Sequence, residues 1–163
     1  MSKDREALLR WLPLLAWMTV VFLFSSDSFS VPRTSRFLGP FFGWLLPNAQ
    51  PETIATCIFA IRKLAHALEY AVLALLAWRA LGGSDIDGFR PWIWNRAARA
   101  WLIAAVYAAS DEWHQSFVPS RGAAVVDVLI DATGAAVALA FLALVARMLR
   151  LRAERKSNAA SGN

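Results

Sequence analysis

Two short polar strings interrupt long apolar stretches of this sequence and hold most of its side chains that could do acid–base chemistry. The first is R-K-L-A-H-A-L-E-Y, at residues 62–70, and the second is D-E-W-H-Q-S-F-V-P-S-R, at residues 111–121. Charged groups in hydrocarbon cost several kcal/mol each. A chain that keeps a set of them in apolar surroundings therefore indicates a use for them.

Three predicted helices each carry one polar stripe. At 100° per residue, polar side chains share a helix face in three regions, near 62–70, 107–115 and 127–138. The stripes consist of Arg62, Lys63, His66, Glu69 and Tyr70; of Tyr107, Asp111 and Gln115 flanked by Glu112 and His114; and of Asp127, Asp131, Gly134 and Ala138. Such stripes normally turn away from lipid, so one cavity could hold the whole set.

Acids outnumber fixed cations in this set. Its five acids are Glu69, Asp111, Glu112, Asp127 and Asp131, and its three cations are Arg62, Lys63 and Arg121. Packed together at low dielectric, these acids cannot all be ionised and unpaired. They must share protons, bind a cation or stand in a wet cavity.

The residue types suggest distinct roles within one site. Glu69 can orient His66 as a general base or acid, because the two are three residues apart on a helix. Asp111 and Glu112 would provide a second carboxylate or bind a divalent cation. Oxygen ligands favour Mg²⁺, Mn²⁺ or Ca²⁺, and Zn²⁺ is an alternative if His66 is also a ligand. Lys63 and Arg121 suit a phosphate. The further substrate-binding candidates are Tyr70, Gln115, Asp127 and Asp131.

The elements that must position these residues are predicted to be membrane-spanning helices. The chain has 163 residues, of which 58% are hydrophobic. Four apolar stretches, at about 8–26, 55–81, 98–116 and 123–149, come close to the roughly 20 residues that a bilayer demands. We therefore predict an all-α, four-helix transmembrane domain over residues 1–150, with a disordered tail at 151–163. Residues 27–53 are too interrupted by proline to cross and are expected to lie in the outer interface.

Charge distribution predicts the topology. The net charge is +5, and twelve of the seventeen basic residues lie before the first stretch, between the second and third, or after the fourth. The positive-inside rule then places both termini and the 82–98 loop in the cytoplasm. The topology thus accounts for the basic residues. The expected partners of the protein are membrane lipids and not nucleic acid. With this topology, all the polar residues above fall in the outer leaflet.

At these residues the chain resembles the VanZ-like family of membrane proteins, named for a teicoplanin-resistance protein. The pattern K-x-x-H-x-x-E-Y is matched from Lys63 to Tyr70. The pattern D-E-x-x-Q-x-F-x-P-x-R, followed by D-x-x-x-N-x-x-G, is matched from Asp111 to Gly134, with Asp131 in place of the usual Asn. The resemblance covers about residues 11–148, and the 25–27 turn is also similar. It implies a multi-pass protein of the bacterial plasma membrane linked to glycopeptide resistance.

Three functions remain open from the sequence. The first is an enzyme that acts at the outer leaflet on a lipid headgroup or a lipid-linked cell-envelope intermediate. The second is a non-enzymatic protein that binds a lipid or an amphiphilic antibiotic with the same residues. The third is a proton-coupled transporter, which is the least favoured because no polar stripe reaches the cytoplasmic half.

Overall fold

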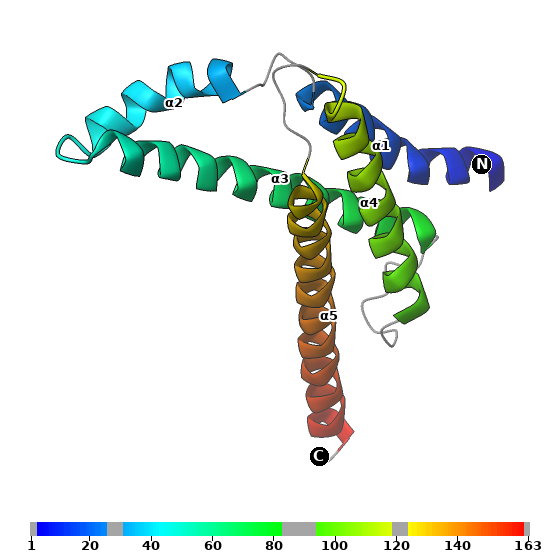
Figure 1. The fold of residues 1–163 in the computed structure, drawn as a ribbon. Helices are drawn as coiled ribbons and strands as arrows, with labels where there is room; N and C mark the ends of the chain where they lie inside the picture. The colour runs from blue at the N-terminus through cyan, green and yellow to red at the C-terminus, as the bar shows by residue number, and fades with distance from the viewer. Residues whose placement is uncertain (1–2, 26–30, 83–93, 119–123, 162–163) are drawn as a thin grey trace.

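The computed structural model describes residues 3–25, 31–82, 94–118 and 124–161, and the regular structure in these ranges is entirely helical. The helices are α1 (Lys3–Phe24), α2 (Val31–Leu45), α3 (Pro51–Leu81), α4 (Trp94–Gln115) and α5 (Val125–Ser161). Figure 1 shows α2 and the first part of α3 extending away from the region where α1, α3, α4 and α5 come together. The predicted all-α class is confirmed for the described residues.

Three of the helices, α1, α3 and α5, are long and apolar enough to cross a membrane by length and composition. The apolar stretches of the sequence predict four membrane-spanning helices. Helix α4 has 22 residues, but basic residues near its start and the acids Asp111 and Glu112 near its end shorten its apolar stretch. Helix α2 has 15 residues, roughly 22 Å, which is less than the roughly 30 Å of a hydrocarbon core.

The ends of α3 follow from local chemistry. Gln50 precedes the helix in an extended conformation, and Pro51 takes the first position, where a missing N–H costs nothing. Gly82 ends the helix, and its N–H donates to the carbonyl of Arg79 at 3.3 Å. A 31-residue helix results, with its polar string in the middle of its length.

Helices α1, α3, α4 and α5 pack around a core made largely of alanine. Ala74 and Ala77 from α3, Ala104 from α4 and Ala135 from α5 are all fully buried in it, and Val21 joins them from α1. Small side chains allow helix backbones to approach closely. The core therefore depends on close helix contact more than on large interlocking side chains.

Helices α3 and α5 approach closely at Gly134 of α5 and Ala67 of α3. A Cβ atom added to Gly134 would lie only 2.9 Å from the Cα of Ala67 and even closer to its carbonyl group. The ion pair of Lys63 with Asp127 lies one turn or two earlier on both helices. Contacts that advance in the same order along both chains mean that α3 and α5 cross with the same sense, and Figure 1 shows α5 running across α3.

Helix α5 continues to Ser161, where the composition predicts a disordered tail over 151–163. Alanine, leucine, arginine, lysine and glutamate are good helix formers, and they make up most of 147–156. Arg150 also pairs with Glu154 four residues later, with Nε and Oε1 3.0 Å apart. Low apolar content was therefore a poor guide to the end of this helix.

Candidate functional site

The candidate site lies where three helix ends meet the middle of α3. Ser25 directly follows α1, Asp111 and Gln115 are in the last turns of α4, and Asp127 and Asp131 are in the first turns of α5. Polar side chains are concentrated here because the polar residues of α1, α4 and α5 lie near the ends of these helices. The polar string of α3 passes beside all three ends.

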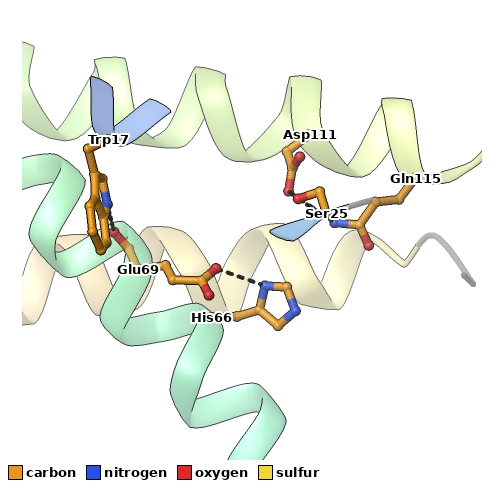
Figure 2. Close-up of polar contacts among 6 residues, drawn as sticks. All are labelled: Trp17, Ser25, His66, Glu69, Asp111 and Gln115. Carbon is orange, nitrogen blue, oxygen red and sulfur yellow. Dashed lines mark hydrogen bonds and ion pairs between the residues drawn. The ribbon is translucent and has the colours of Figure 1, made fainter. Parts of the chain in front are cut away.

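The buried part of the site is a hydrogen-bonded network between α1 and α4 (Figure 2). The Ser25 hydroxyl donates to Asp111 Oδ2 at 2.6 Å, and the amide of Gln115 donates to the same oxygen at 3.0 Å. The Gln115 amide also lies 3.5 Å from Ser25 Oγ. All three residues are at most 4% exposed, so these bonds form in a dry interior. Hydrogen bonds to a charged acceptor are the stronger kind.

Beside this network, three buried oxygens have no hydrogen bond of good geometry within the described part of the chain. They are the Tyr70 hydroxyl, Asp111 Oδ1 and Asp131 Oδ1, and they come from α3, α4 and α5. The Tyr70 hydroxyl is near enough to Asp111 for a weak hydrogen-bond interaction with its carboxyl group, and it interacts electrostatically with Asp131. An unsatisfied buried polar group costs about 1–3 kcal/mol. Buried oxygens that are incompletely hydrogen-bonded therefore need an explanation, and a catalytic role or a further polar partner is one.

A second, more accessible layer borders the buried network. The Lys63 ammonium pairs with Asp127 Oδ1, which joins α3 to α5. Figure 2 shows His66 and Glu69 facing each other on α3, with Nδ1 and Oε2 3.8 Å apart. This distance suits an ion pair but exceeds a hydrogen bond. The side chains of these four residues are 18–25% exposed, so a ligand can reach them.

The Lys63–Asp127 pair gives a direct test of this layer. Exposed pairs contribute about 0.2–1 kcal/mol and breaking buried ones costs about 3–5 kcal/mol. Since this pair is mostly buried, we expect Lys63→Met to lower the unfolding free energy in detergent by about 1–2 kcal/mol. Exchanging the two residues should restore part of that loss.

The exposed pair of Arg150 and Glu154 provides the control, because its side chains are 49% and 52% exposed. Arg150→Met should change the stability by less than about 0.5 kcal/mol. Equal losses from Lys63→Met and Arg150→Met would contradict a special contribution of the pair at the site.

Glu112 has a structural contact that competes with the predicted catalytic role. Its Oε1 accepts a hydrogen bond of 2.7 Å from the backbone N–H of Ala124, immediately before α5 begins. A carboxylate at a helix N-terminus is favourable because of the helix dipole. Glu112 is buried, so its described contact fixes the start of α5.

Sequence reasoning missed several contacts that position the site. The Trp17 indole N–H donates to the Glu69 carbonyl at 2.9 Å (Figure 2), although tryptophan in this sequence reads as a membrane anchor. The Tyr107 hydroxyl donates to the carbonyl of Met18 at 2.6 Å. Ser25 was visible only as part of the 25–27 turn. No pattern in the sequence indicates which helix each of these donors meets.

The structure brings most of the predicted site residues together. Asp131 interacts electrostatically with Glu69, Asp111, Glu112 and Asp127, which links both layers. Arg121, the predicted phosphate ligand, lies outside the described residues. The catalytic and binding roles of all these predicted site residues stay predictions.

The described residues offer no ready metal centre. Within residues 3–25, 31–82, 94–118 and 124–161, no group of three His, Cys, Asp or Glu side chains is placed to hold a metal ion. The carboxyl groups instead use the contacts above.

Comparison with known proteins finds one relationship over most of the chain. The family model described as VanZ/LLP1 matches residues 10–147. No curated protein and no solved structure matches the chain. The matched region contains every predicted site residue and all of the buried network.

Proposed function

The chain belongs to the VanZ/LLP1 family, and from that premise we propose that it acts on a lipid headgroup, or on a lipid-linked cell-envelope intermediate, at its cluster of polar residues. The observation that carries this proposal is the set of three buried, incompletely hydrogen-bonded oxygens on Tyr70, Asp111 and Asp131. They adjoin residues that a headgroup can reach. The site thus combines accessible side chains, which can recognise a headgroup, with buried acids.

In the proposed reaction, His66 acts as a general base or acid beside Glu69. The imidazole Nδ1 and the carboxylate Oε2 are 3.8 Å apart, which exceeds a hydrogen bond. Catalytic hydrogen bonds are often long before substrate binds and shorten afterwards. Lys63 would hold a phosphate, and Asp111 would supply the second carboxyl group.

The proposed topology is a four-span protein of the bacterial plasma membrane, with α4 as the fourth span and both termini in the cytoplasm. The distribution of basic residues supports it. The order of the contacts between α3 and α5 also fits, because both helices would run from outside to inside. The site then lies in the outer leaflet, where envelope intermediates and glycopeptide antibiotics are found together.

Binding without chemistry is the second candidate, and one observation favours it. Asp111 and Glu112 are only 4% and 7% exposed, and both already accept hydrogen bonds. Groups held in this way are suited to shaping a pocket. A lipid or an amphiphilic antibiotic would then be retained unchanged, and altered teicoplanin sensitivity would follow from that retention.

Lipid analysis of the purified protein separates the two candidates. The protein is isolated in native-membrane particles, and its lipids are identified by mass spectrometry before and after incubation with envelope lipid extract. We expect a headgroup to change with the wild type, and at least tenfold more slowly with Glu69→Gln or Asp111→Asn. Both variants remove one charge from the acid–base pairings of the site.

Glu52→Gln is the matched control, since Glu52 is an exposed acid in the first turn of α3, away from the site. It should behave as the wild type. If a lipid is retained unchanged by the wild type and lost from the two site variants, the protein binds and does not catalyse. A headgroup change of equal rate in all the proteins would overturn the assignment of the site.

A further inference from the structure

An apolar groove lies between α3 and α5, next to the accessible layer of the site. Its volume is about 640 Å³, and its walls include Leu64 from α3 and Leu129 and Phe141 from α5. Thr133 carries the one hydroxyl among the lining side chains, and it donates to the carbonyl of Leu129 at 2.6 Å. The lining therefore offers a ligand hydrocarbon contacts.

The first lining residues of the groove are next in the chain to the ion pair that joins the two helices. Leu64 follows Lys63 and Val126 precedes Asp127, and neither charged residue is itself part of the lining. Along α5 the lining continues from Val126 to Phe141, a distance of roughly 22 Å at about 1.5 Å per residue. One leaflet of a bilayer is about 15 Å of hydrocarbon. The α5 wall of the groove is thus long enough to accompany a chain across a leaflet, and the ion pair adjoins its first residue.

We propose that the groove holds one acyl chain of a phospholipid whose phosphate meets Lys63. An ammonium group has three donors, and Asp127 accepts from Lys63, which leaves donors for a phosphate. Both charged side chains are more than one-fifth exposed, so a phosphate can approach them. This inference rests on the proposed function and specifies its ligand as a phospholipid.

A transmembrane helix of another chain fits the groove less well. Such a helix would present apolar side chains along its whole length and would cover the Lys63–Asp127 pair with them. Removing charged groups from polar contact within a membrane is costly. A phospholipid has its charge at one end only, which matches the distribution of charge along the groove.

The groove can be blocked without touching the charged residues. Val137 lines it and is 62% exposed, so Val137→Trp should fill it without disturbing the core. Val106 of α4 is 60% exposed and does not line it, which makes Val106→Trp a matched control. Leu129→Trp fills the groove from a second position.

The test uses the full-length protein in nanodiscs of phosphatidylcholine and phosphatidylglycerol with a tenth part of diacylglycerol. Native mass spectrometry after gentle release reports which lipid stays bound. We expect the wild type and Val106→Trp to retain a phospholipid, and Val137→Trp and Leu129→Trp to retain at least fivefold less. Diacylglycerol, which has the same chains without phosphate, should be retained at least tenfold less than a phospholipid.

Equal retention by all four proteins would overturn the proposal, and so would a second copy of the chain in place of the lipid. Retention of diacylglycerol as well as phospholipid would remove Lys63 as the phosphate contact. A blocked groove with an unchanged rate of headgroup conversion would overturn the groove and leave the proposed function intact. Loss of retention with no conversion by any protein would leave the groove and overturn catalysis.

Discussion

Gly134→Ala is expected to lower the stability of the protein, although alanine is the better helix former by about 1 kcal/mol. The added Cβ would meet the backbone of Ala67, with 2.8 Å to its carbonyl carbon. Backbone atoms cannot rotate away as a flexible side chain can, so the two helices must separate. Overpacking of this kind costs about 1–3 kcal/mol, which outweighs the gain in helix propensity. Gly134→Val should cost more.

Thermal unfolding in detergent, followed by circular dichroism, measures this effect. Gly43 is the matched control, because it is also inside a helix but a Cβ there would meet nothing within 4 Å. Gly43→Ala should be as stable as the wild type or more so. If Gly134→Ala were equally stable, the close approach of α3 and α5 would be wrong. Separation of these helices should also break the Lys63–Asp127 pair and so reduce ligand retention.

The second large effect is expected at Asp111. Asp111→Ala removes the acceptor of two buried hydrogen bonds, from Ser25 and from Gln115. Leaving a buried donor without a partner costs about 1–3 kcal/mol. We therefore expect a loss of unfolding free energy in that range, measured by denaturation in mixed micelles.

A double-mutant cycle assigns the loss to the network. Ser25→Ala alone should cost about 1 kcal/mol, and the double variant with Asp111→Ala should cost less than the sum, by about 1 kcal/mol. Ser110→Ala is the control, because the exposed Ser110 hydroxyl donates only to the carbonyl of Tyr107 in its own helix. Strictly additive losses would show that Ser25 and Asp111 act independently.

Much of the fold could be predicted from the sequence because apolar length has a direct physical meaning in a membrane. The stretch expected at 55–81 is α3, Pro51–Leu81, and that expected at 98–116 overlaps α4, Trp94–Gln115. The ends were less accurate, since polar residues extend a helix beyond its apolar part. This is why α5 reaches Ser161.

The polar stripes could also be predicted, because the 3.6-residue period places side chains on faces without any knowledge of their partners. The partners themselves could not. Whether Asp111 meets Ser25 or Lys63 depends on where the helices cross, and the crossing of α3 and α5 is fixed by Gly134 against Ala67. These helices contain many small residues, and nothing in the sequence indicates that Gly134 is the one in contact with α3.

The contact between α3 and α5 has a consequence for biosynthesis. Lys63 and Asp127 are 64 residues apart in the chain, and ribosomes deliver the chain from its N-terminus. Helix α3 therefore reaches the membrane with its charged string before α5, which carries the partners of that string, has been made. Ser25 is present from the start, but its acceptor Asp111 arrives 86 residues later. The site is completed only once α5 has been synthesised, so a chain that stops before α5 would leave Lys63 without its partner Asp127.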